Sequence, residues 1–136
     1  MDKLKEIGKL LNTQDNRATD APLFIVQQKI IDYGYTSDYA EDYEWMDANN
    51  EYSKADSKKA KQLETLDDAG EDTGTWEKIY YKERWEFVTA CFTEQGCTDY
   101  IAINGHNLNE PRIYAEGSYR NNEFRTIRDW LKKLYV

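Results

Sequence analysis

Polar side chains that suit a small anionic ligand are concentrated in two stretches of the chain, residues 15–29 and residues 104–121. Arginine matches the planar geometry of phosphate and carboxylate groups, while asparagine, histidine and tyrosine add directional hydrogen bonds. Connections held by a rigid scaffold often carry binding groups, so we predict one shared polar pocket for a small polar or nucleotide-like ligand. Its predicted ligand-binding residues are Asn16, Arg17, Gln27, Lys29, His106, Asn107, Arg112, Tyr114, Tyr119, Arg120 and Asn121.

A purely structural interpretation of the same residues remains open. Asparagine, aspartate and glycine are ordinary turn and cap residues. Arg112 and Arg120 can pair with surface carboxylates, and His106 can bond a backbone carbonyl beside a helix end. The sequence does not decide between a binding site and a set of turns and caps.

The residues needed for catalysis or metal binding are scarce. The chain has no GxSxG, HExxH, P-loop or GxGxxG motif. His106 is its one histidine, so a Cys–His enzyme would have to pair it with Cys91 or Cys97. We expect both cysteines to be buried free thiols, whereas a nucleophilic cysteine needs an electropositive, partly exposed environment. The prediction is a non-enzymatic protein with no catalytic residue, no metal and no cofactor.

The net negative charge of the chain comes from one segment. The chain has 18 basic and 26 acidic residues and a net charge of −8. Residues 38–72 contain twelve acidic residues and four lysines, which accounts for the whole imbalance. No basic stripe is present, so we expect no direct binding to nucleic acid.

The acidic segment has two interpretations. Tyrosines and Trp45 are interleaved with its carboxylates, and such a surface can mimic a nucleic-acid backbone and occupy a basic groove on a host protein. An acidic inhibitor of that kind is the alternative function. The plainer interpretation is a solvated surface that keeps the protein soluble.

The order of the expected elements indicates an α+β fold. The apolar pattern and the turn residues predict helices at 2–11, 57–69 and 93–104, a C-terminal helix that begins at Asn121 or Asn122, and strands at 23–33, 43–46, 76–92 and 112–116. We expect a small mixed or antiparallel sheet of three to five strands, with helices packed against it. The strand at 76–92 carries bulky residues on both faces, so it should be central and covered on each side, unless a bend at 82–84 splits it.

Three of the helices carry more detailed predictions. Ser57 and Gly70 should cap the helix at 57–69, whose apolar residues Leu63 and Leu66 anchor it weakly. Thr93 should cap the next helix, which we favour over a β-hairpin through 94–96. The long C-terminal helix should be amphipathic and capped by Asn121 or Asn122. Its apolar stripe is Phe124, Ile127, Leu131 and Leu134, widened by Trp130.

Length and hydropathy predict one soluble domain over residues 1–136, with 38–75 as an acidic, partly mobile, insertion-like segment. No apolar run reaches the roughly 18 residues of a membrane helix, and the first residues alternate charged and apolar types, unlike a signal peptide. We therefore expect a cytoplasmic protein with no membrane partner. Exposed tyrosines and the weakly anchored helix are compatible with a homodimer.

Three blocks of the sequence resemble a family of small proteins encoded by tailed bacteriophages and by prophages. They are DNRATDAPLFIVQQK (15–29), WEFVTACFTEQGCTDYIAINGHNL (85–108) and PRIYAEGSYRN (111–121), together a little over a third of the chain. NGHNL and PRIY are the most specific parts. The resemblance implies an accessory role in the infected bacterial cytoplasm, such as countering a host factor or a defence signal, but no particular chemistry.

Overall fold

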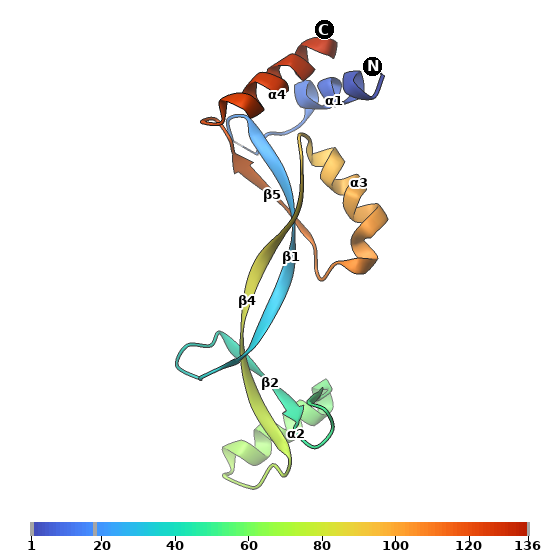
Figure 1. Ribbon diagram of the computed structural model, residues 1–136. Helices are drawn as coiled ribbons and strands as arrows, with labels where there is room; N and C mark the ends of the chain where they lie inside the picture. The colour runs from blue at the N-terminus through green and yellow to red at the C-terminus, as the bar shows by residue number, and fades with distance from the viewer. Residues whose placement is uncertain (1, 18, 136) are drawn as a thin grey trace. The chain divides into compact units, whose positions relative to one another are not determined.

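The computed structural model describes residues 2–17 and 19–135 and has an α+β fold (Figure 1). Its elements are α1 (Asp2–Thr13), β1 (Pro22–Tyr35), β2 (Asp42–Asp47), β3 (Ser53–Lys54), α2 (Ser57–Asp68), β4 (Trp76–Cys91), α3 (Glu94–Asn104), the 3₁₀ helix η1 (Gly105–Asn107), β5 (Arg112–Gly117) and α4 (Asn122–Tyr135). The strands form one antiparallel five-stranded sheet in the order β3-β2-β4-β1-β5. The predicted fold class is therefore confirmed. None of the helices in the described ranges is both long enough and apolar enough to cross a membrane.

The chain divides into two compact units. Unit 1 consists of residues 1–29 and 85–136, and unit 2 consists of residues 30–84. Strands β1 and β4 each contribute one part to each unit. The acidic segment 38–75 lies entirely within unit 2, so the two units are described separately.

The core of unit 1 lies between α3 and one face of the sheet. Phe24, Val26 and Cys97 are completely buried there. Side chains alternate between the faces of a strand, so Phe24 and Val26 share this face, and their partners on β5, Ala115 and Ile113, pack against the same core. The opposite face carries the residue between them, Ile25, which is also buried at 6% exposure.

Thr93 starts α3 as predicted. Its hydroxyl accepts a hydrogen bond from the Gly96 N–H at 3.0 Å, the usual N-cap geometry. The helix continues to Asn104, and the alternative hairpin at 94–96 is not formed. This local signal was sufficient because the capping residue and the helix that it caps are adjacent in sequence.

Helix α4 packs against α1 in unit 1 through part of the predicted stripe, since Leu131 is buried and Phe124 and Leu134 are partly buried. Leu11 of α1 and Leu131 of α4 are buried, and Phe92 and Phe124 stack with their ring centroids 5.0 Å apart. Ile127 and Trp130 are each 48% exposed. Arg128 takes the buried position instead, because it lies four residues after Phe124 and three before Leu131 on the same helical face.

Helix α2 is anchored in unit 2 more firmly than its two leucines suggested. Leu63 is 1% exposed, and its neighbour Glu64 accepts hydrogen bonds from two aromatic side chains of β2. Asp56 caps the helix rather than Ser57, since its carboxylate accepts from the Lys59 N–H at 2.7 Å. At the other end Ala69 is the C-cap, and Gly70 follows it with a φ of +70°.

Strand β4 is third in the sheet order, as expected of a central strand, and it is continuous through 82–84. The predicted cover on both faces is wrong, because none of its residues is buried. Strand β2 pairs only with its first part, as far as Tyr81, so the remainder lacks a strand neighbour on that side. The two-residue strand β3, which pairs with β2, was not predicted.

Candidate functional site

The structure distributes the eleven predicted ligand-binding residues over separate places in unit 1. Strand register decides the distribution. Gln27 lies opposite Arg112, and Ile25 lies opposite Tyr114, so these side chains share the sheet face that α3 does not cover. Arg17, in contrast, lies on the α3 side.

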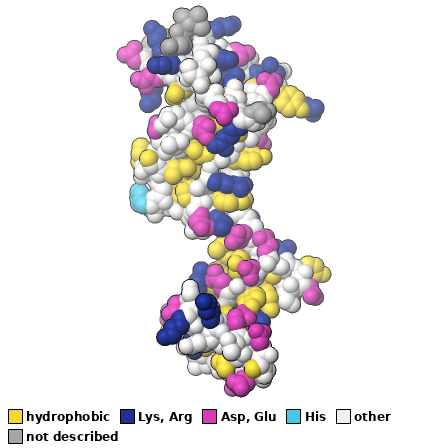
Figure 2. All heavy atoms as spheres, turned by 180° about the vertical axis from the view of Figure 1, so that it is seen from behind, with side chains coloured by type: hydrophobic (Ala, Val, Ile, Leu, Met, Phe, Trp, Pro, Cys, Tyr) yellow, Lys and Arg dark blue, Asp and Glu magenta, His cyan; other side chains and the backbone are white. Residues whose placement is uncertain are grey.

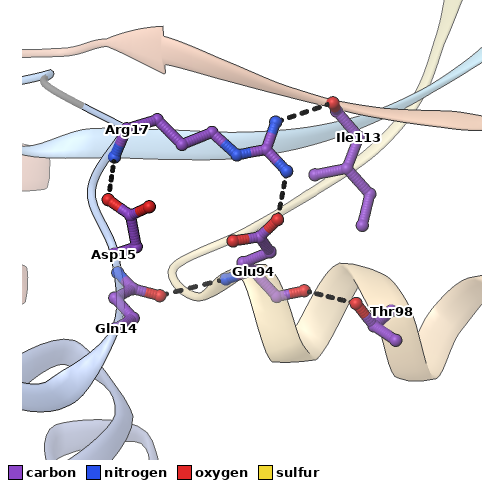
Figure 3. Close-up of polar contacts among 6 residues, drawn as sticks. All are labelled: Gln14, Asp15, Arg17, Glu94, Thr98 and Ile113. Carbon is purple, nitrogen blue, oxygen red and sulfur yellow. Dashed lines mark hydrogen bonds and ion pairs between the residues drawn. The ribbon is translucent and has the colours of Figure 1, made fainter.

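Arg17 links three parts of unit 1 (Figure 3). Its guanidinium donates to the Ile113 carbonyl at 3.2 Å and forms an ion pair with the Glu94 carboxylate at the start of α3. Its backbone N–H donates to Asp15 at 2.8 Å, and Gln14 accepts from the Glu94 N–H at 3.1 Å. This network fixes the turn before β1 against α3 and β5. The Arg17 guanidinium is already engaged by two protein groups. Asn16 accepts a hydrogen bond from the Gln14 side chain at 3.3 Å in the same turn.

Arg112 is held flat on the open face of the sheet. Its guanidinium carbon lies 3.7 Å from the Trp85 ring centroid, and its Nε donates to Gln27 at 2.9 Å. The Tyr114 ring is 5.9 Å away. Stacking and the hydrogen bond orient the guanidinium, so this group rigidifies the face.

Two further predicted groups lie near the start of β5. Lys29 pairs with Glu110 at 3.0 Å, and its backbone exchanges hydrogen bonds with Asn109. His106 and Asn107 are exposed on η1.

The remaining three predicted residues, Tyr119, Arg120 and Asn121, line one hollow between β5 and α4. Its volume is about 700 Å³. Its full lining is Leu23, Glu116, Gly117, Ser118, Tyr119, Arg120, Asn121, Asn122 and Glu123. We call the cavity that these residues line the 116–123 hollow. The Ser118 hydroxyl donates to the Ala21 carbonyl, and Arg125 donates to the Tyr119 carbonyl at 2.9 Å, so the loop that forms the hollow is held at both ends.

The electrostatics of the 116–123 hollow favour an anionic group at one side. Asn121 caps α4 by accepting from the Phe124 N–H at 3.0 Å, which places the positive end of the helix dipole here. The Arg120 guanidinium lies 5.2 Å from the Tyr119 ring centroid, and no carboxylate of the described residues lies within ion-pair distance of it. Glu123, in the first turn of α4, and Glu116 add carboxylate acceptors to the lining.

Sequence reasoning missed a polar cluster in unit 2. Glu64 of α2 accepts from the Tyr43 hydroxyl and, at 2.8 Å, from the Trp45 indole N–H. Lys78 lies 4.7 Å from the Tyr43 ring centroid and pairs with Asp67 at 2.7 Å. The spacing of Tyr43 and Trp45 places both on one face of β2 and could have been noticed in the sequence. It does not indicate that their partner is Glu64 of α2.

These contacts perturb the acid–base behaviour of the cluster. The hydrogen bond to the Glu64 carboxylate, followed by burial, raises the pKa of Tyr43 to about 12. The hydrogen bonds from Tyr43 and Trp45 lower the pKa of Glu64 below its usual value, against the effect of burial. Asp67 raises the pKa of Lys78. Each of these contacts favours the protonation state in which it forms, and each helps to anchor α2.

One group of carboxylates in the described ranges is close enough to hold a metal ion. Glu64, Asp67 and Asp68 offer oxygens within 4.8 Å of one another. Glu64 and Asp67 already have the partners given above, and those bonds explain their positions. Glu64 and Asp67 therefore act as structural supports of α2.

Comparison with family models, with curated proteins and with solved structures finds no match for this chain. The functional argument therefore rests on the geometry of the two units.

Proposed function

We propose that this chain is a non-enzymatic binding protein that holds a small polar, anionic ligand in the 116–123 hollow. The observation that carries the proposal is Arg120, an arginine beside the start of α4 without a carboxylate partner among the described residues. The other predicted cations with stated contacts, such as Arg17 and Arg112, are already held by protein groups. In line with the resemblance to phage and prophage proteins, we place this binding in the infected bacterial cytoplasm, where it counters a host factor or a defence signal.

The lining suggests the chemistry of the ligand. A phosphate or carboxylate would be stabilised by Arg120 and by the N-terminal end of α4. Glu116 and Glu123 would repel a second anionic group but accept hydrogen bonds from hydroxyl or amino groups. Tyr119 offers a ring surface next to them. A nucleotide-like compound with one anionic group and several donors fits this set.

Calorimetric titration with AMP, inorganic phosphate and ribose tests the proposal. We expect AMP to bind most tightly and Arg120→Ala to weaken AMP binding at least tenfold, which corresponds to about 1.4 kcal/mol. The matched control is Arg112→Ala, which removes an arginine of unit 1 outside the hollow. Equal losses in both variants, or no binding of any probe by the native chain, would contradict the proposal.

A second function is favoured by the distribution of charge between the units. Unit 2 contains 15 acidic and 7 basic residues, which gives −8, whereas unit 1 contains 11 of each. Exposed tyrosines accompany the carboxylates of unit 2, including Tyr39 and Tyr52 at 71% and 52% exposure. Figure 2 shows acidic and hydrophobic side chains next to each other on this unit. We propose that unit 2 can occupy a basic groove of a host protein as a mimic of nucleic acid.

A charge-matched pair of triple variants tests this second function. Asp38→Asn, Glu51→Gln and Glu71→Gln neutralise exposed carboxylates of unit 2, and Asp2→Asn, Asp20→Asn and Asp129→Asn make the same net change in unit 1. In affinity capture of a basic host protein at low salt, we expect only the unit 2 variant to lose the partner. A partner retained equally by both variants, or unaffected by high salt, would refute the electrostatic mechanism.

A further inference from the structure

Unit 1 contains a second cavity, which lies between α1, the end of β4 and the first turns of α3 (Figure 1). Its volume is about 400 Å³, which is within the range of sites that bind small molecules. It shares no lining residue with the 116–123 hollow, so it is a separate site. We call it the α1–α3 cavity.

The wall of the α1–α3 cavity is largely apolar. Ile7 and Leu10 come from α1, and Cys91 and Phe92 come from the end of β4 and the residue that follows it. All four are only half-buried, although residues of these types are usually found inside proteins. Because they gather around one space, a ligand that fills it removes their remaining apolar surface from water.

The elements that form the cavity are already fixed in unit 1. Phe92 stacks on Phe124 of α4 with the ring centroids 5.0 Å apart. Gln14, directly after α1, accepts from the Glu94 N–H at 3.1 Å and so ties α1 to the start of α3. Gly96 allows a close approach of α3 to β4, since a Cβ atom at this position would lie 3.1 Å from a side chain of β4. The walls therefore need little reorganisation, which reduces the free-energy cost of binding.

The polar groups of the lining do not require a charged ligand. The Thr93 hydroxyl accepts from a backbone N–H of α3 at 3.0 Å, and Gln95 donates to the Asp99 carboxylate at 2.8 Å. Lys3 and Glu6 have opposite charges and lie three residues apart on the same side of α1, so their fields offset each other. No buried side-chain nitrogen or oxygen of this lining lacks a hydrogen-bond partner in the described ranges.

We propose that the α1–α3 cavity binds an uncharged, largely apolar small molecule, with a single aromatic ring or a branched aliphatic group of similar size. A charged group would lose hydration at the apolar wall without meeting an unpaired buried partner. The apolar surface to be covered belongs to a few side chains only. A probe as small as benzyl alcohol should therefore bind with a Kd of about 1 mM.

Amide NMR titration of the full chain tests the choice of ligand. Benzyl alcohol should cause saturable shifts in α1 and in the first turns of α3, and none at residues 116–123. Phenylacetate and benzylamine carry the same ring with a negative or a positive charge, and both should bind at least about fivefold more weakly. Absence of saturable shifts, shifts spread evenly over the chain, or equal or tighter binding of either charged compound would overturn the proposal.

A matched pair of variants tests the position of the site. Leu10→Gln places a polar group in the wall and should weaken benzyl alcohol binding at least about tenfold. The control is Ile103→Gln, because Ile103 is 73% exposed on α3 and does not line the cavity. The same spectra show whether each variant is folded. Binding that persists in folded Leu10→Gln, or is lost in Ile103→Gln, would contradict this position.

Cys91 gives a test in the native chain that needs no variant. It lines the cavity, whereas Cys97 is completely buried. Saturating benzyl alcohol should slow alkylation of Cys91 by iodoacetamide several-fold and leave the alkylation of glutathione in the same solution unchanged. Half-maximal protection should occur at the concentration that half-saturates the NMR shifts. An unchanged rate at Cys91 would exclude binding at this wall.

Discussion

Replacing Glu64 tests whether hydrogen bonds, rather than leucines alone, hold α2 in unit 2. Its carboxylate accepts from the Trp45 indole N–H at 2.8 Å and from the Tyr43 hydroxyl. Trp45 is 6% exposed, so its N–H has little access to water when the acceptor is removed, whereas the half-buried Tyr43 can bond to water instead. Glu64→Ala should therefore destabilise unit 2 mainly through Trp45.

The magnitude follows from these two environments. Losing a charge-assisted bond to a buried donor costs about 1.5–3 kcal/mol, and losing one that water replaces costs about 0.5–1 kcal/mol. The two effects share one carboxylate and are not fully additive, so we expect a loss of about 2–3 kcal/mol at neutral pH. Glu64→Gln retains one acceptor without the charge and should lose about 1 kcal/mol.

Urea unfolding and amide exchange of α2 measure the effect, with Gln62→Ala on the same helix as the control. Gln62 is exposed, and its replacement should change stability by less than about 0.5 kcal/mol. Because the folded state lowers the pKa of Glu64, the stabilisation is present above the usual pKa of a glutamate and is lost as the pH falls through the lowered value. A Glu64→Ala loss no larger than that of Gln62→Ala, or one that persists unchanged at pH 2, would refute this reasoning.

Further predictions concern single groups in either unit. Ultraviolet titration should find one tyrosine with a pKa of about 12 that Tyr43→Phe removes, and its contribution to stability should be lost as the pH rises through that value. A disulfide reagent at pH 8 should modify Cys91 but not Cys97, because burial raises the pKa of Cys97 to about 12; labelling of Cys97 in the folded Cys91→Ser variant would contradict this. Asn121→Ala should lower stability in urea unfolding by about 1 kcal/mol through loss of the α4 cap, whereas Asn122→Ala should not. Arg128→Met should leave the melting temperature unchanged or raise it, because Arg128 is 5% exposed and its Nε has no hydrogen-bond acceptor among the described residues; a fall of several degrees would show that the guanidinium has a stabilising partner.

Elements encoded by neighbouring residues were predictable from the sequence. Thr93 and the apolar spacing after it predicted α3, and Asn121 was one of two predicted caps for α4. The strands that became β1, β4 and β5 were also predicted near their observed positions. In each case, the signal and the structure that it specifies lie within one or two turns or a single strand.

Features that depend on tertiary partners were not predictable. The two-residue strand β3 exists because it pairs with Met46 and Asp47, and a two-residue run has no periodicity. The buried face of α4 is set by its packing against α1, which brings Arg128 inward and leaves Ile127 and Trp130 exposed. The apolar pattern identified Leu131, Phe124 and Leu134 on the inward side, but it could not place a charged residue such as Arg128 there.

In the candidate site, too, the sequence identified the residue types but not the tertiary partners of each side chain. The sequence does not distinguish Arg17, Arg112 and Arg120, and all three were predicted ligand-binding residues. The fold gives Arg17 a carboxylate from α3 and gives Arg112 a tryptophan and a glutamine, which fix both guanidinium groups within unit 1. Only contacts distant in sequence distinguish them from Arg120, which lines the 116–123 hollow. Arg17 and Arg112 lose conformational freedom on folding, whereas Arg120, whose stated contact is with the neighbouring Tyr119 ring, has part of that cost still to meet on binding. Under the proposed function, we therefore expect the ligand to supply an anionic group, because a charge-assisted hydrogen bond to the guanidinium is stronger than one to a neutral acceptor.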